Sequence, residues 1–394
     1  MKLKRLLLIS FLAGWAGITL AGPDPELAAA LQTIRAVGPE GQGNASASAA
    51  WNQLVAHRAA STLLPLLTAM DGANDYALNW LRVAVDAIAA RATKADRELP
   101  LPELGKFLLE TSHHPAARRQ AFELIAQNVP ATADKLLPGM LNDPSLEIRF
   151  EAVQQLLNQA RQSLARSNTV GAALLFQQAL NFARDVQQVE DIAKQLKALG
   201  RPVDLQKHFA FLADWKVIGP FDNTRNAGFE TAYPPEQELD LAAEYDGKKG
   251  RVRWQSYTTT HEYGMVDMNQ PCGKLKEVLA YATTDFYSER PQPAELRLGG
   301  KNSWKVWLNG KLLFGRDEYH TSAEIDQYPM PAQLQAGRNT ILVKVCQNEQ
   351  VEEWTNEWEF QLRVTDSLGT PIVQARSHRP AAGQTPATEN RARN

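Results

Sequence analysis

The chain has 394 residues, of which 44% are apolar and 22% are charged. This is globular composition with length for two domains, and it excludes a wholly disordered or collagen-like protein. The net charge of −2 provides no broad basic field, so nucleic acid and anionic membranes are not expected partners.

The first residues have the pattern of a secretory signal peptide. Lys2, Lys4 and Arg5 precede an apolar run, and Thr19-Leu20-Ala21 provides small residues at a cleavage site. The run is shorter than the roughly 20 residues that span a bilayer. We therefore expect residues 1–21 to be removed near Ala21, and the product to be secreted or periplasmic without membrane insertion.

Residues 22–205 are expected to form a helical repeat domain. Arg118, Ala121, Phe122 and Ile125 recur 31 residues later as Arg149, Ala152, Val153 and Leu156. This offset resembles a HEAT-type repeat and predicts an irregular α-solenoid, in which each helix pair buries its apolar stripe against neighbouring pairs. A plain helical bundle is the alternative.

Residues 206–375 are expected to form a β-domain. Six of the nine Trp lie between Trp215 and Trp358, and strands are predicted at residues 295–298, 304–308, 340–345 and 357–365. Asn309-Gly310 is a hairpin turn signal, since both positions tolerate positive φ. Short strands with such turns favour a β-sandwich or jelly roll. Residues 376–394 contain no large apolar side chain and are predicted to be a disordered tail.

The junction of the two regions resembles that of secreted bacterial HEAT-repeat proteins with a galactose-binding-like β-sandwich. The similarity is carried by residues 199–205, 214–223, 233–236, 245–248, 306–311 and 337–344. The last two segments also resemble the sugar-binding-like domain of family 2 glycoside hydrolases. The resemblance implies a non-catalytic module, because the catalytic barrel of those hydrolases would need about 250 further residues.

A candidate ligand site lies around the predicted hairpin. Alternation places Trp304, Val306 and Leu308 on one face of the strand and Trp307 on the other. An exposed Trp307 with polar neighbours would suit sugar rings. The alternative is that a loop or the helical domain covers Trp307. The candidate ligand-binding residues are Trp307, Asn309, Arg316, Asp317, Tyr319 and His320.

No catalytic residue or cofactor is predicted, because none of the usual nucleophile, zinc or nucleotide motifs occurs. Five glutamates near Trp354 and Trp358 could supply a carboxylate pair, but a solvated acidic loop is the preferred interpretation. Asp222 and Asn223 are candidate ligands for a structural calcium ion, although such residues in turns usually bond their own backbone.

Cys272 and Cys346 are the two cysteines of the chain. Export would permit a disulfide between them, whereas a buried free cysteine behaves as a small apolar residue, so both states remain open.

The leading hypothesis is a secreted, non-enzymatic protein whose β-domain binds carbohydrate or a glycan-bearing surface. The helices would then present this domain or contact a protein partner. A protein interaction scaffold with a purely structural β-domain is the alternative, and a glycoside-acting enzyme is third.

Overall fold

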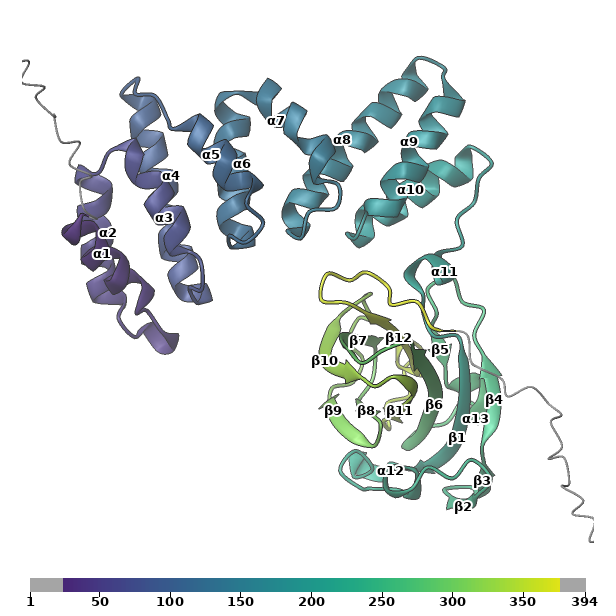
Figure 1. Ribbon diagram of the computed structural model, residues 1–394. Helices are drawn as coiled ribbons and strands as arrows, with labels where there is room; N and C mark the ends of the chain where they lie inside the picture. The colour runs from purple at the N-terminus through teal and green to yellow at the C-terminus, as the bar shows by residue number, and fades with distance from the viewer. Residues whose placement is uncertain (1–23, 376–394) are drawn as a thin grey trace, which may run out of the picture. The chain divides into compact units, whose positions relative to one another are not determined.

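The structure is a computed structural model that describes residues 24–375 (Figure 1). The predicted signal peptide and the predicted disordered tail lie outside the described residues. The chain divides into two compact units between Ala152 and Val153, within helix α8. Helices precede strands along the chain, as the sequence predicts: the last long helix ends at Ala198 and the first strand begins at Asp214.

The first unit is helical. Asp24 begins it by accepting hydrogen bonds from the backbone N–H groups of Glu26 and Leu27, which caps the first helix. Successive helices α1 and α2, α3 and α4, and α5 and α6 pack against each other. The helices are α1 (Pro25–Arg35), α2 (Asn44–His57), α3 (Leu63–Ala69), α4 (Asp75–Lys94), α5 (Leu101–Leu109), α6 (Pro115–Asn128), α7 (Pro130–Leu136) and the start of α8 (Leu146–Ala165).

The first arginine of the predicted repeat is buried and ion-paired. Arg118 is 1% exposed, and its guanidinium donates to both carboxylate oxygens of Asp143 at 2.7 Å and to the carbonyl of Leu108 at 2.8 Å. Arg149, at the equivalent position, is also buried and donates to the carbonyl of Asp143 at 3.0 Å. The two equivalent arginines therefore fix the same loop, which precedes α8. The solenoid arrangement itself stays a prediction.

The second unit contains the remaining helices and all strands assigned in residues 24–375. The helices are the end of α8, α9 (Thr169–Phe182), α10 (Val186–Ala198), α11 (Leu205–Phe209), α12 (Pro234–Gln237) and α13 (Asn269–Cys272). The strands are β1 (Asp214–Asp222), β2 (Glu244–Gly247), β3 (Gly250–Arg253), β4 (Gln255–Thr258), β5 (Val266–Asp267), β6 (Val278–Ser288), β7 (Gln292–Gly300), β8 (Trp304–Leu308), β9 (Lys311–Arg316), β10 (Tyr328–Leu334), β11 (Gly337–Gln347) and β12 (Glu359–Thr365).

The strands form antiparallel sheets. Six strands pair in the order β4-β1-β6-β11-β8-β9, and four pair in the order β10-β7-β12-β5, while β2 and β3 form a separate hairpin. All strand pairs among these are antiparallel. The predicted turn joins β8 to β9, where Asn309 has φ 51° and Gly310 has φ 78°, as a two-residue hairpin of this kind requires.

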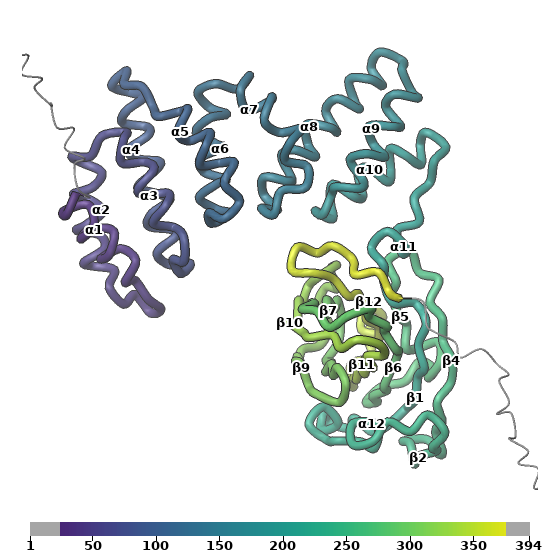
Figure 2. Tube along the Cα trace, viewed as in Figure 1, coloured from purple at the N-terminus to yellow at the C-terminus, as the bar shows by residue number. Residues whose placement is uncertain are grey.

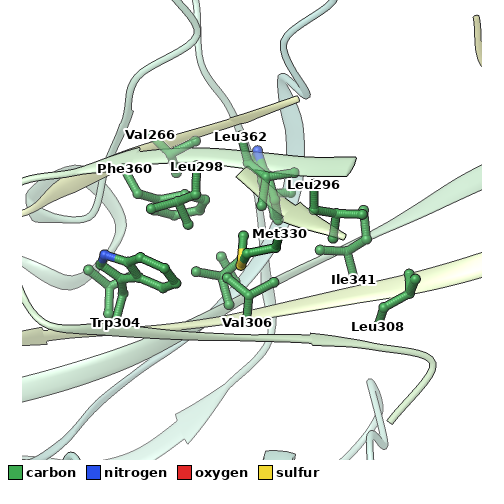
Figure 3. Packing of buried hydrophobic residues seen from close by; sticks show 14 of the residues in the cluster. Val266, Leu296, Leu298, Trp304, Val306, Leu308, Met330, Ile341, Phe360 and Leu362 are labelled. Atoms are coloured by element: carbon green, nitrogen blue, oxygen red, sulfur yellow. The ribbon is translucent and has the colours of Figure 1, made fainter. Parts of the chain in front are cut away.

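One apolar core lies between the six-stranded and four-stranded sheets (Figure 3). Trp304, Val306 and Leu308 of β8 contribute to it from one sheet, and Leu298 and Phe360 from the other. These are the alternate positions of β8 that the sequence assigns to a single face. The prediction of the core-facing side of β8 is confirmed.

A second apolar cluster lies on the opposite face of the six-stranded sheet. The connection from β1 to β4, residues 223–254, contributes Phe229 and Val252 to it, and the sheet contributes Tyr281, Trp307 and other side chains. This connection contains α12 and the β2–β3 hairpin, which lie at one end of the domain (Figure 2). The outer face of this sheet is therefore covered in part rather than left to solvent.

None of the helices within residues 24–375 is long and apolar enough to cross a membrane.

Candidate functional site

Trp307 lies on the outer face of the six-stranded sheet, as alternation predicts, but it is 7% exposed. The connection from β1 to β4 covers it, which is the alternative named above. Trp307 is consequently not an open platform. It still reaches a cavity at the edge of this cover.

The cavity has a volume of about 850 Å³ and lies on the uncovered end of the outer face. Strands of the sheet form its floor, and α12 with the residues that follow it forms one wall. Its lining combines apolar, hydroxyl and charged groups: Asp214, Trp215, Lys216, Pro235, Glu236, Gln237, Leu239, Leu241, Ser256, Thr258, Thr283, Thr284, Asp285, Trp307, Asn309, Gly310, Arg338, Thr340 and Leu342.

The floor is a row of side chains in direct cross-strand register. Lys216 of β1 is opposite Ser256 of β4 and Thr283 of β6, and Thr283 is opposite Leu342 of β11. Leu342 is in turn opposite Trp307 of β8. Residues opposite each other in an antiparallel sheet share a face, so five strands contribute to one surface.

Hydrogen bonds fix the polar groups beside this row. The hydroxyl of Thr258 donates to Asp214 at 2.7 Å, and that of Thr340 donates to Asp285 at 2.8 Å. The ammonium of Lys216 is 2.6 Å from the hydroxyl oxygen of Ser256. The carboxylates keep further lone pairs for a ligand, because each of these bonds uses only one of their oxygens. The floor therefore presents oriented acceptors and the ammonium of Lys216, and Arg338 is a second cation of the lining.

Asn309 reaches the same cavity from the hairpin turn. Its side-chain oxygen accepts from the backbone N–H of Thr340 at 2.9 Å, and its amide nitrogen donates to Asn339 at 3.0 Å. The side chain is thus positioned on β11. Of the six residues predicted to bind a ligand, Trp307 and Asn309 line the cavity.

The other four predicted residues lie away from it. Arg316 is the register partner of Trp304, at the end of the β8–β9 hairpin opposite the turn, and forms an ion pair with Glu318. Asp317 follows it and is exposed. The six residues therefore do not form one site, because the hairpin separates its turn from its open end.

Tyr319 and His320 belong to a polar cluster near the open end of the hairpin. The Tyr319 hydroxyl accepts from the side-chain amide of Asn223 at 3.1 Å, and burial raises the pKa of this tyrosine well above its usual value. The Nε2 atom of His320 is 2.9 Å from the side-chain oxygen of Asn348. Neither residue lines the cavity.

The two candidate calcium ligands have protein partners. Asp222 is bonded by the Thr224 hydroxyl and lies 2.9 Å from the Lys248 ammonium, and these contacts hold the pKa of its carboxyl below the usual value. Asn223 is fully buried, and its oxygen accepts from the backbone N–H of Gly228 at 3.0 Å. Within residues 24–375, no three His, Cys, Asp or Glu side chains form a group that could hold a metal ion.

Both cysteines are free thiols. Cys346 is in the outer cluster, whereas Cys272 packs against the core between the sheets. Burial raises the pKa of each thiol to about 12. Of the two states that the sequence leaves open, the structure has the unbonded one.

The glutamates near Trp354 and Trp358 are spread along a loop and the start of β12. Trp358 is fully buried in the core, while Trp354 is 62% exposed. Lys301 forms ion pairs with Glu357 and Glu359 at 2.6 and 3.1 Å. The single ammonium offsets part of the charge of these two carboxylates, and such ion pairs fit the interpretation as a surface loop better than a catalytic pair.

Most residues of the cavity have no local signal in the sequence. Asp285 and Thr283 lie on β6, which was not predicted as a strand, and Glu236 belongs to a segment that was quoted only for its resemblance. The alternation of Asp214 and Lys216 with the buried Trp215 and Val217 is the local signal that places them on the outer face.

Comparisons with known proteins give little further information. No family model matches the chain, and no curated protein matches it. Among solved structures, the GH31 alpha-xylosidase from Xanthomonas citri is similar over 31% of this chain and 17% of its own, with 11% identity and a TM-score of 0.18. The chain thus spans about a sixth of that enzyme, and a similarity of this size supports no argument about function.

Proposed function

We propose that the β-domain is a non-enzymatic carbohydrate-binding module and that its ligand occupies the cavity on the outer face of the six-stranded sheet. The observation that carries this proposal is the composition of the lining. An indole ring stands beside a floor of hydroxyl and carboxylate groups whose orientations are fixed. Sugars present C–H faces to aromatic rings and hydroxyls to oriented acceptors, so both parts of the lining have a counterpart on the ligand.

The finer architecture belongs to the same proposal. We infer that the two sheets form a jelly roll of the galactose-binding-like kind and that the helices form a HEAT-like solenoid that presents it. Export through removal of residues 1–21 is also part of the proposal. Intact-mass measurement of the purified protein should then give a chain beginning at Gly22.

The direct test is a glycan array probed with residues 22–394, followed by titration calorimetry with soluble glycans that bind. Lys216→Met removes a cation from the floor and is expected to weaken binding about tenfold, the usual effect of losing one hydrogen bond to a charged group. Lys311→Met is the matched control, because Lys311 is exposed on β9 and does not line the cavity. Equal loss in both variants would contradict a site at the cavity.

A protein interaction scaffold is the second candidate. Val170 and Leu174 of α9 lie one helical turn apart and are 64% and 60% exposed, which gives the helices an apolar contact surface. If wild-type protein binds no glycan on the array, this candidate replaces the first.

A further inference from the structure

Two lysines of the six-stranded sheet lie directly opposite each other on its outer face. Lys344 of β11 is the register partner of Lys305 of β8. Like charges in this arrangement destabilise a sheet. Carboxylates that neutralise these two lysines therefore stabilise the sheet.

Both neutralising carboxylates come from the connection that covers this face. The Lys305 ammonium is 3.1 Å from Glu230 and 4.1 Å from the centre of the Phe229 ring. Lys344 is fully buried, and its ammonium is 2.8 Å from Glu236 Oε1. It also donates to the carbonyls of Phe229 and Thr231 at 3.0 and 2.8 Å. Lys344 thus fixes both the course of the connection and the position of one carboxylate.

Glu236 is held at one oxygen and reaches the cavity. Its Oε1 accepts from Lys344 and also from the Tyr281 hydroxyl. The side chain is 13% exposed, and the residue lines the cavity. A carboxylate has a second oxygen with its own lone pairs, so anchoring Oε1 leaves Oε2 able to accept from a ligand.

We propose that Glu236 is a ligand-binding residue that accepts hydrogen bonds from sugar hydroxyls, and that Lys344 and Tyr281 are its positioning residues. The inference rests on the proposed function and names the ligand more closely. Lys344 cancels the charge of Glu236, so the site does not favour a cation. The two aspartates of the lining, Asp214 and Asp285, are balanced by Lys216 and Arg338, so the site does not favour an anion either. The ligand class that remains is a neutral sugar with adjacent hydroxyls.

Preorganisation is the reason that such a residue would contribute strongly. Hydrogen bonds to a carboxylate are stronger than those between neutral groups. A carboxylate already fixed by a buried ammonium and a tyrosine loses little side-chain freedom when the ligand binds. Trp307 lies on the floor of the same cavity, where a C–H face of the sugar could contact it while its hydroxyls reach Glu236.

The binding experiment uses cellohexaose, because it is an uncharged oligosaccharide with adjacent ring hydroxyls. Wild-type protein should bind it, and Glu236→Gln should weaken binding about tenfold or more. Glu230→Gln is the matched control, since Glu230 pairs with the neighbouring lysine but does not line the cavity. Wild-type affinity in Glu236→Gln would overturn the inference.

A double variant separates binding from folding. Glu236→Gln alone leaves the Lys344 ammonium buried without its charged partner, which lowers the melting temperature. In Glu236→Gln/Lys344→Met no buried charge remains at this position, so the melting temperature should recover in part, although the carbonyls of Phe229 and Thr231 lose their donor, while cellohexaose binding stays weak. Recovery of binding together with stability would show that Glu236 acts only on folding and would overturn its role as a ligand contact.

The positioning role has a measurement that needs no ligand. Lys344→Met should speed amide hydrogen exchange in residues 229–241 of the full chain, whereas Lys301→Met, which removes ion pairs elsewhere on the domain, should not. Unchanged exchange in Lys344→Met would overturn this role. If wild type binds only charged array glycans, the inferred ligand class is wrong and the proposed function stands; binding to no glycan removes the proposed function itself. If wild type binds another neutral glycan but not cellohexaose, the same variants are measured with that glycan.

Discussion

The outer faces of the two main sheets share an electrostatic arrangement but differ in what covers them. On the four-stranded sheet, Arg297 of β7 is directly opposite Arg363 of β12, just as Lys305 is opposite Lys344 on the six-stranded sheet. A single carboxylate, Asp326, serves both arginines, at 2.7 Å from Arg297 Nη1 and 2.7 Å from Arg363 Nε.

The difference lies in the length of chain that supplies the carboxylates. Asp326 lies just before β10 and reaches both guanidinium groups from a short connection. The two lysines instead pair with Glu230 and Glu236, which belong to the long connection of residues 223–254. This connection also packs apolar side chains on the sheet and leaves part of the outer face uncovered, where the cavity lies. Cross-strand repulsion can thus be relieved by a shorter connection, whereas the longer one also lines the cavity described above.

The largest expected effects are on stability, and they test whether residues 223–254 pack on the six-stranded sheet as tightly as a core does. Trp304→Ala should destabilise the β-domain by about 3–5 kcal/mol, the usual range for a buried aromatic residue. Trp307→Ala should cost about 2–3 kcal/mol, because this ring packs in the outer cluster on one side and borders the cavity on the other. Urea unfolding followed by tryptophan fluorescence measures both. A cost below about 0.5 kcal/mol for Trp307→Ala would mean that the cover does not pack on it.

The next effect concerns the shared carboxylate of the four-stranded sheet. Asp326→Asn removes the counter-charge of the buried Arg363 and leaves Arg297 with Glu295 as its ion-pair partner, so it should destabilise the domain by about 2–3 kcal/mol. Asp317→Asn, at an exposed position near the end of β9, is the control and should change the unfolding free energy little. Similar values for the two variants would show that Arg297 and Arg363 do not need Asp326.

The same carboxylate predicts a dependence on pH. Burial by itself would raise the pKa of Asp326, but Arg363 and Arg297 outweigh it and hold this pKa below the ordinary value of 3.8. A depressed pKa means that the contribution to stability is complete well above the ordinary value, by about pH 5, and is lost as the pH falls through the depressed pKa. Thermal melts should therefore show wild type losing more stability than Asp326→Asn between pH 5 and about pH 3. Parallel losses would contradict this assignment.

The smallest effect separates the two carboxylates of the long cover. Glu230 is 81% exposed at its side chain, whereas Glu236 is 13% exposed. Solvent screening limits an exposed ion pair, so Glu230→Gln should change the unfolding free energy by less than about 0.5 kcal/mol. Chemical denaturation of Glu230→Gln beside Glu236→Gln gives the comparison. A large loss of unfolding free energy in Glu230→Gln would show that Lys305 depends on its carboxylate as much as Lys344 does.

Local sequence patterns predicted β8, its hairpin and its core-facing side. The strand from Trp304 to Leu308 has the predicted ends, and Asn309-Gly310 forms the predicted turn. These features depend on alternation and on backbone preferences within a few residues. The helices before residue 205 were predicted from apolar spacing, which is also a pattern within a few residues.

The cavity depends on pairings between segments far apart in the sequence. Lys216 is brought beside Thr283 by the pairing of β1 with β6, and no local pattern specifies that register. The strand β6 itself was missed, although it lies between β1 and β11 in the six-stranded sheet. Its buried residues occur on both faces, so it lacks the alternation that reveals a half-exposed strand. The sequence also left open whether Trp307 is covered or exposed. The residues that cover it precede it by more than fifty positions, so no local pattern connects them to it.

The buried thiol of Cys346 gives this domain a built-in chemical reporter. The thiolate is the reactive form of cysteine, and a pKa of about 12 leaves almost none of it at neutral pH while the outer cluster is closed. Alkylation by iodoacetamide would then proceed only through moments when residues 223–254 lift from the sheet. The labelling rate at Cys346, read by peptide mass, would report how often the cover opens in the native protein.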